Sequence, residues 1–212
     1  MILNKKKALQ LIELLNKSIK NPKTSLKYKN RFTLLISVVL SAQCTDVNVN
    51  NVTKNIYQKY YRPEHFVDLG INKIKNLIKS IGLFNNKAKN LYNLSKILLE
   101  KYQSKVPNNF DDLINLPGVG RKTANVVLNA AFNKPTIAVD THVFRVGNRT
   151  GLTNGKNPNQ VEEQLLKILP NKYLKKAHHL ILLHGRYICK SRNPLCGKCV
   201  INKICLYKDK NE

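Results

Sequence analysis

The chain has 212 residues, of which 42% are hydrophobic, so it is long enough and apolar enough to bury a core and is not an intrinsically disordered protein. Its 37 Lys and Arg residues outnumber 12 Asp and Glu residues, which gives a formal net charge of +25 and a pI near 10.0. A folded protein this basic is expected to bind a polyanion, most often nucleic acid, although abundant Lys, Asn and Ile are also what AT-rich coding DNA produces.

No secretory or membrane-spanning segment is expected. The N-terminal stretch is amphipathic and lacks the apolar centre of a signal peptide, and the most apolar run, at 32–40, is too short to span a bilayer. Four of the five cysteines lie between 189 and 205, which is not the scattered pattern of a disulfide framework. We therefore expect a cytoplasmic protein that has no contact with a membrane.

Apolar residues recur at helical spacing along almost the whole chain. The helices are predicted, in chain order, from the N-terminal segment up to 20, over 31–41, from about 49 to Pro63, around 71–78, around 91–98, after Pro107, over 121–132, and from about Thr141, Pro158 and Tyr173. The segment 31–41 is almost entirely apolar, which predicts a buried central helix. No strand, repeat or low-complexity linker is predicted, so the fold class is all-α. The proline-containing interruption at 133–135 is the best boundary between two helical lobes.

The turn LPGVG at 116–120 separates two predicted helices and indicates a helix-hairpin-helix motif. Gly118 and Gly120 permit backbone angles that residues with a Cβ resist, and they leave room for main-chain N–H groups to approach an anion. Together with the N-terminus of the following helix, these amides suit a DNA phosphate and would bind DNA of any sequence. A plain corner between two helices is the alternative.

Lys122 lies in the first turn of the second hairpin helix, where the helix dipole disfavours an ammonium group. A partly buried lysine at this place would serve as a nucleophilic amine. A solvated or phosphate-pairing lysine is the alternative, and the hairpin residues alone do not decide between the two. Asp140 directly precedes the helix predicted from Thr141, and aspartate is a favoured N-cap residue.

Four cysteines near the C-terminus follow the pattern C-x6-C-x2-C-x5-C. They are Cys189, Cys196, Cys199 and Cys205. Thiols this close together in a reducing compartment indicate a shared metal site. Spacing alone leaves open a zinc ion and an iron–sulfur cluster, because both use four cysteines. Either would fold a short segment that has little core of its own.

Long, ordered motifs along the chain resemble the endonuclease III family of helix-hairpin-helix DNA glycosylases. These motifs are LLISVVLSAQCTDVNVN at 34–50, SIGLFNNKAKN at 80–90, LPGVGRKTANVVLNAAF at 116–132, PTIAVDTHVFRVGNRTG at 135–151 and LHGRYICKSRNPLCGKCVINKIC at 183–205. The resemblance implies a bifunctional DNA glycosylase and AP lyase of base excision repair. Such an enzyme removes oxidised pyrimidines and then cleaves 3′ to the abasic site by β-elimination through a lysine Schiff base.

The same resemblance implies roles for individual residues. Lys122 becomes the nucleophile, Asp140 the essential carboxylate, and the four cysteines the ligands of one 4Fe-4S cluster. Gln43 is expected to fill the position of the extruded nucleotide and Leu83 to insert into the base stack, whereas from the residues alone they would be a loop amide and a core contact at a helix end. The full set of expected DNA-binding residues is Gln43, Leu83, Gly118, Val119, Gly120, Arg121, Lys190 and Arg192.

Asp46 and His142 are expected near the flipped base or its sugar, with helix capping as the alternative for Asp46. His178, His179 and His184 show no metal-ligand pattern and are expected to pack or cap.

We expect two domains. A helical domain over 25–134 contains the hairpin, a cluster-bearing helical domain combines 1–24 with 135–212, and DNA and the active site lie at the cleft between them. The expected partner is double-stranded DNA with damaged pyrimidines or abasic sites, bound by a monomer that associates with the nucleoid through DNA.

Three other functions are compatible with parts of the sequence. A non-catalytic helix-hairpin-helix DNA-binding module explains the charge and the hairpin but leaves Asp140 and the cysteines unexplained, and a zinc-stabilised DNA-binding protein is a variant of it. An adenine-specific glycosylase usually lacks the hairpin lysine and carries a glutamate near SVVLSAQ. This chain has Lys122 and no glutamate within 31–45.

Overall fold

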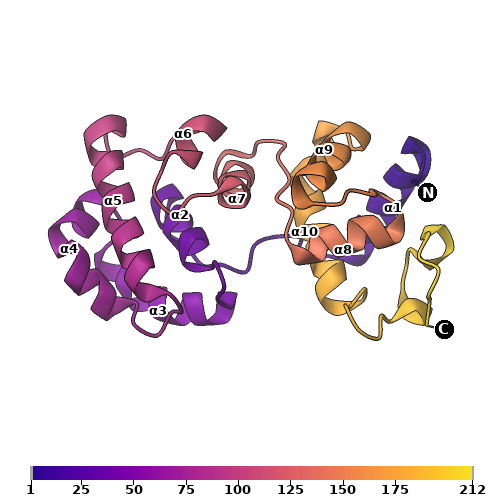
Figure 1. Cartoon of the computed structure of the whole chain (residues 1–212), viewed down its shortest axis with the longest axis horizontal. Helices are drawn as coiled ribbons and strands as arrows, with labels where there is room; N and C mark the ends of the chain where they lie inside the picture. The colour runs from indigo at the N-terminus through magenta and orange to yellow at the C-terminus, as the bar shows by residue number, and fades with distance from the viewer. Residues whose placement is uncertain (1, 212) are drawn as a thin grey trace. The chain divides into compact units, whose positions relative to one another are not determined.

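The computed structural model describes residues 2–211, and these residues contain α-helices and short 3-10 turns but no strand (Figure 1). The all-α prediction is therefore confirmed. The chain divides into two compact units: unit 2 is Ser25–Phe132, and unit 1 combines Met1–Thr24 with Asn133–Glu212. Within 2–211 no helix has both the length and the apolarity needed to cross a membrane.

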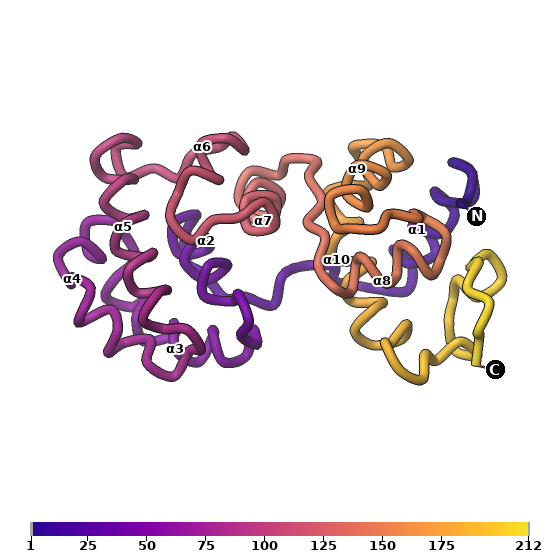
Figure 2. The backbone as a smooth tube through the Cα atoms, in the orientation of Figure 1, coloured from indigo at the N-terminus to yellow at the C-terminus, as the bar shows by residue number. Residues whose placement is uncertain are grey.

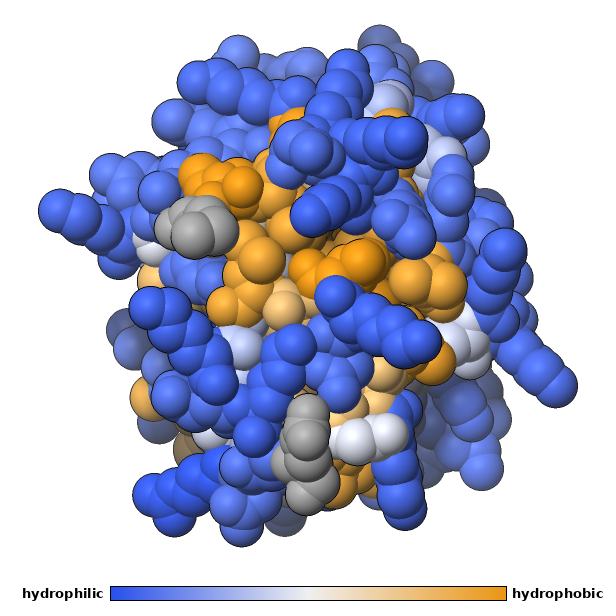
Figure 3. All heavy atoms as spheres, turned by 90° about the vertical axis from the view of Figure 1, so that its right-hand side faces the viewer, coloured by the Kyte–Doolittle hydropathy of each residue, from blue (hydrophilic) through white to orange (hydrophobic). Residues whose placement is uncertain are grey.

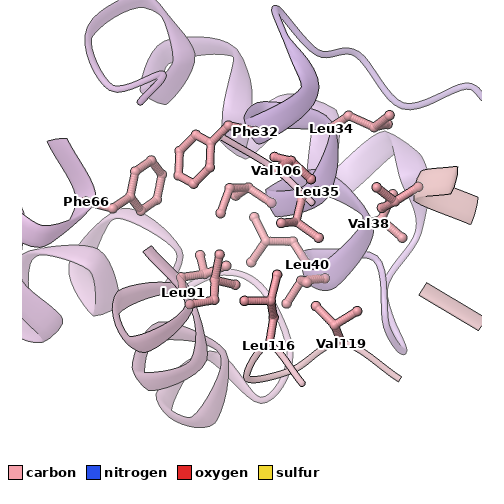
Figure 4. Close-up of a cluster of buried hydrophobic side chains, with 14 of the residues drawn as sticks. Phe32, Leu34, Leu35, Val38, Leu40, Phe66, Leu91, Val106, Leu116 and Val119 are labelled. Carbon is pink, nitrogen blue, oxygen red and sulfur yellow. The ribbon is translucent and has the colours of Figure 1, made fainter. Parts of the chain in front are cut away.

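Unit 2 is built around α2. Its helices are α2 (Arg31–Leu40), α3 (Asp46–Lys59), α4 (Pro63–Leu77), α5 (Phe84–Tyr102), α6 (Phe110–Ile114) and α7 (Arg121–Phe132). Helix α2 packs against α3, α5 and α7, and all of its residues except Arg31 are buried. Asn30 starts it with a capping box in which its side chain accepts from the Thr33 N–H at 2.9 Å. The predicted buried central helix is confirmed, and Figure 4 shows its side chains Phe32, Leu35 and Leu40 within the apolar cluster.

Helix α4 begins earlier than the apolar pattern predicted. Pro63 ends the extended stretch after α3 and is itself the first residue of α4, where a missing N–H is tolerated. Gly70, with φ of 68°, interrupts the helix and separates its first turns from the predicted Ile71–Ile78 portion.

Unit 1 brings the first and last helices of the chain together. Its helices are α1 (Lys5–Ser18), α8 (Thr141–Thr150), α9 (Pro158–Ile168) and α10 (Asn171–Tyr187), followed by 3-10 turns at Cys196–Lys198 and Asn202–Ile204. Both α1 and α8 pack on α10, and the tube in Figure 2 shows α1 beside these later helices. The buried side chains Ile137 and Val139 attach the extended segment before α8 to the same core. The face of unit 1 in Figure 3 is largely hydrophilic around a smaller apolar area, as expected from the basic composition.

Candidate functional site

The hairpin turn between α6 and α7 is anchored from inside unit 2. The Val119 N–H donates to the Leu116 carbonyl at 3.0 Å, and the Ala124 N–H donates to the Gly120 carbonyl at 2.9 Å as α7 begins. Leu116 and Val119 are 3% and 5% exposed, and Figure 4 shows both side chains in the apolar cluster of unit 2. Val119 therefore closes the turn with its N–H and its side chain. It does not present a free amide to DNA, contrary to the expectation for this residue.

The two glycines of the turn differ. Gly118 has φ of +79°, and a Cβ at this position would lie 2.9 Å from the Asn90 side-chain nitrogen, so glycine is required there. Gly120 has no positive φ, and no atom lies within 4 Å of the place a Cβ would take. The prediction of a special backbone angle is confirmed for Gly118 and wrong for Gly120, whose missing side chain leaves open space in front of α7.

Alanine at Gly118 is expected to destabilise the protein by about 1–3 kcal/mol, because the left-handed backbone and the Asn90 contact are both unfavourable for a Cβ. The matched variant Gly120→Ala meets neither obstacle and should cost less than about 1 kcal/mol. Urea unfolding of both variants measures the difference. Equal free energies of unfolding for the two variants would show that the geometry of the turn is not what selects glycine.

Arg121 and Lys122 occupy the first turn of α7, and both are exposed. The partly buried position considered for Lys122 is therefore not found. The first-turn N–H groups of a helix have no acceptor within that helix and make its N-terminus electropositive. The structure thus brings together an anion-binding helix end, an open glycine surface and a solvent-accessible primary amine.

Asp140 is the N-cap of α8, as predicted. Its Oδ1 accepts from the Val143 N–H at 2.8 Å, and its backbone is extended with φ of −100°. The side chain is half-buried and follows three buried residues, so the carboxylate is held in one orientation. His142, two residues on, has its Nδ1 3.2 Å from Arg145 Nη2.

Gln43 and Leu83 have left-handed backbones, as do Gln103 and Ser104 of the same unit. Gln43 has φ of 53° and is exposed; Leu83 has φ of 59° and is 57% exposed just before α5. The core position that the residues alone suggested for Leu83 is not found. The exposure of the Leu83 side chain and the strain of its backbone each cost free energy. Backbone strain of this kind is concentrated at functional sites.

Asp46 is the first residue of α3, but Thr45 is its N-cap and accepts from the Asn48 N–H at 3.2 Å. The capping alternative for Asp46 is wrong, and its carboxylate instead accepts a hydrogen bond from the Ser25 hydroxyl.

The four predicted metal ligands line a single pocket in unit 1. Cys189 follows α10, Cys196 and Cys199 bracket the first 3-10 turn, and Cys205 follows the second. All four are half-buried free thiols. Within 2–211 no three His, Cys, Asp or Glu side chains are grouped as ligands of one metal ion.

The donor set of this pocket fits an iron–sulfur cluster. Four thiolates also suit a single zinc ion, with Zn–S bonds of about 2.3 Å, so the donor set alone leaves both groups open. Burial raises the pKa of the Cys199 and Cys205 thiols, so bound cations are needed to hold thiolates there at neutral pH.

Two residues beside the cysteines were not identified from the sequence. Arg149 donates to the Lys190 carbonyl at 2.6 Å and to the Ser191 carbonyl at 2.9 Å, and its Nη1 lies 4.0 Å from Cys189 Sγ. It thereby holds the loop on which Lys190 and Arg192 are exposed. His184, only 3% exposed, has its Nε2 3.6 Å from Cys199 Sγ, and burial lowers its pKa to about 4. No sequence pattern distinguishes these two side chains from other basic residues.

His178 and His179 pack inside unit 1, as expected. His178 is buried with its Nδ1 2.8 Å from the Ala138 carbonyl, and its ring contacts that of His179 edge-on.

Two family models match this chain. The family model of the HhH-GPD superfamily of base excision DNA repair proteins matches residues 36–171, and that of the iron–sulfur binding domain of endonuclease III matches 189–205. Endonuclease III of Rickettsia conorii is 57% identical over 93% of this chain and 94% of the relative. Endonuclease III of Escherichia coli K12 is 50% identical over 98% of this chain and 99% of the relative.

Solved structures give the same result. A trapped covalent intermediate of an endonuclease III with DNA matches with a TM-score of 0.90 and 42% identity over 96% of both chains. A thermostable thymine-DNA glycosylase matches with a TM-score of 0.87 and 26% identity over 95% of this chain and 96% of that one.

The matches extend over both the hairpin and the four-cysteine segment. The chain is a DNA glycosylase and AP lyase of base excision repair, and it carries one 4Fe-4S cluster. It belongs to the endonuclease III family of the HhH-GPD superfamily.

Proposed function

We propose that this enzyme removes oxidised pyrimidines from double-stranded DNA and cleaves the strand 3′ to the resulting abasic site, with Lys122 as nucleophile and Asp140 as its carboxylate partner. The observation that carries the proposal is the exposed Lys122 amine at the N-terminus of α7, next to the open surface at Gly120. A phosphate bound at this helix end brings a deoxyribose toward that amine.

In the proposed reaction, Lys122 Nζ loses a proton and forms a bond to C1′ while the glycosidic C1′–N bond breaks and the base leaves with the electron pair. Asp140 stabilises the positive charge that develops on the sugar and accepts the proton of the amine. The C1′–O4′ bond then breaks, O4′ takes its electron pair and the proton held by Asp140, and the nitrogen lone pair forms an iminium between Nζ and C1′. The iminium acidifies the C2′ proton, and loss of that proton expels the 3′ phosphate. The trapped covalent complex of the related endonuclease III with DNA supports an intermediate of this kind.

DNA binding in this proposal uses side chains and main-chain groups of both units. The hairpin holds a phosphate at the start of α7, and the loop fixed by Arg149 presents basic side chains to the backbone. Gln43 and Leu83 enter the stack at the lesion. Asp46 and His142 approach the extruded base or its sugar, and the enzyme acts as a monomer on cytoplasmic DNA. The proposed DNA contacts are Gln43, Leu83, Gly118, Gly120, Arg121, Lys190 and Arg192.

A panel of duplexes that each contain one lesion tests this function. We expect cleavage of duplexes with thymine glycol, dihydrouracil or a preformed abasic site, and little cleavage of undamaged or 8-oxoguanine duplexes. Cleavage of the abasic duplex alone would contradict the glycosylase assignment. Tight binding without cleavage of any duplex would favour the non-catalytic module.

A further inference from the structure

Lys87 is a buried lysine whose side chain bonds only to main-chain carbonyls among the described residues. It lies on α5 and is 5% exposed. Its Nζ donates to the Leu40 carbonyl at 2.9 Å and to the Ala42 carbonyl at 2.7 Å, at the C-terminus of α2. The Leu40 carbonyl is the last of α2 and has no partner within that helix, and both carbonyls lie at its negative end, which favours a cation there.

Burying an ammonium group is costly, and burial lowers the pKa of Lys87, with the neighbouring Cys44 opposing that shift. An apolar side chain would serve the core of unit 2 without this cost. The position therefore indicates that the two hydrogen bonds have a use beyond packing.

The main chain of Lys87 is hydrogen-bonded to the loop that contains Leu83, just before α5. The Lys87 N–H donates to the Leu83 carbonyl at 3.0 Å. Lys87 is thus bonded at one end to the residue before Gln43 and at the other to Leu83, and both of these loop residues have left-handed backbones.

A second pair of contacts shows that the two loops lie side by side. A Cβ at Gly82 would be 3.9 Å from the Gln43 carbonyl, and Asn48 Nδ2 donates to the Ser80 carbonyl at 3.2 Å. Asn48 thus links the Gln43 and Leu83 loops at the surface, whereas the buried Lys87 links them from within the core.

We infer that Lys87 is a positioning residue that holds the Gln43 and Leu83 loops in a fixed relative position, so that both enter the duplex together when a nucleotide is extruded. The inference rests on the proposed roles of Gln43 and Leu83. Without the two side-chain bonds, Asn48 alone still joins the edges of the loops, so the Gln43 loop is held less firmly relative to the Leu83 loop and the two insertions are no longer simultaneous.

The variant Lys87→Met tests the inference, because methionine fills the buried space and makes neither hydrogen bond. Lys101→Met is the matched control: Lys101 is an exposed lysine at the other end of α5, and its loss changes the net charge equally. Base extrusion is followed by the fluorescence of 2-aminopurine beside thymine glycol in duplex DNA. Chemistry without extrusion is followed by borohydride trapping on a single-stranded oligonucleotide with an abasic site.

For Lys87→Met we expect extrusion and the kcat on the lesion duplex to fall about tenfold to hundredfold, as for a displaced active-site group. Affinity for undamaged duplex and trapping on the single strand should stay within about twofold of the wild type, because neither needs the two loops to insert. Lys101→Met should match the wild type in every assay.

Wild-type extrusion by Lys87→Met would overturn the inference, and so would a loss of single-strand trapping as large as the loss on the duplex. If Lys87→Met does not fold, Lys87→Gln replaces it, since glutamine keeps a donor but is one bond too short to bridge both carbonyls, and the same outcomes apply. Failure of the wild type on the lesion duplex would instead refute the proposed function.

Discussion

Replacing Lys122 with alanine is expected to abolish base removal and strand cleavage together, with a fall in rate on the order of 10⁴-fold or more. The same amine is proposed to displace the base and to form the Schiff base, so one change removes both steps. Because Lys122 is exposed, the free energy of unfolding should change by less than about 0.5 kcal/mol. Thymine glycol cleavage and borohydride trapping measure the loss, and the wild type should give a trapped complex that the variant does not.

The control for lost positive charge is Lys101→Ala, which removes an exposed lysine with no proposed role. Asp140→Asn is the informative companion, because asparagine caps a helix as well as aspartate and keeps the bond from the Val143 N–H. Only the negative charge is lost, so DNA binding should persist while the reaction slows by about 10²-fold or more. A trapped complex of wild-type yield in Lys122→Ala would assign the nucleophile to another residue.

Replacing Cys199 with serine is expected to remove the cluster and to unfold the segment from about 188 to 206. That segment has few apolar contacts of its own; Ile201 is its one fully buried hydrophobic residue. Metal binding in such segments contributes on the order of 10 kcal/mol, so its loss exceeds what these contacts supply. Iron and sulfide content, visible absorption and limited proteolysis measure the change.

Cys44→Ser is the matched control for that experiment. Cys44 belongs to unit 2, whereas the four ligands belong to unit 1, and it accepts a hydrogen bond from Asn48 at 3.3 Å that serine can also accept. This variant should keep full iron content and protease resistance. Full iron content in Cys199→Ser would contradict the ligand assignment, and stoichiometric zinc in the wild type would contradict the iron–sulfur cluster.

The helices were predictable because their signals are local. Asn109 and Asp140 cap α6 and α8, and the apolar run of α2 is buried as expected. Features that depend on contacts between distant segments were not predictable. The Lys87 side chain donates to two carbonyls that lie more than 40 residues earlier in the chain. No local sequence pattern distinguishes this lysine from the many solvated ones.

The same distinction holds within the site. Gly118 and Gly120 look equivalent in the sequence, but only Gly118 faces Asn90 from α5, so only the fold tells them apart. Leu83 has the sequence context of a core residue at a helix end, and its left-handed backbone directs it to solvent instead. The resemblance to glycosylases indicated Leu83 where periodicity did not.

Because α1 packs on α10, unit 1 cannot be completed until nearly the whole chain has been synthesised. Unit 2 is continuous and is available for folding as soon as residue 132 has left the ribosome. The apolar face of α1, with Leu11, Ile12 and Leu15, is made first and waits for α10, for roughly 8–30 s at ordinary translation rates. A nascent chain therefore displays the hairpin and Lys122 well before the cluster segment exists, and unit 1 is complete only once α10 has been synthesised.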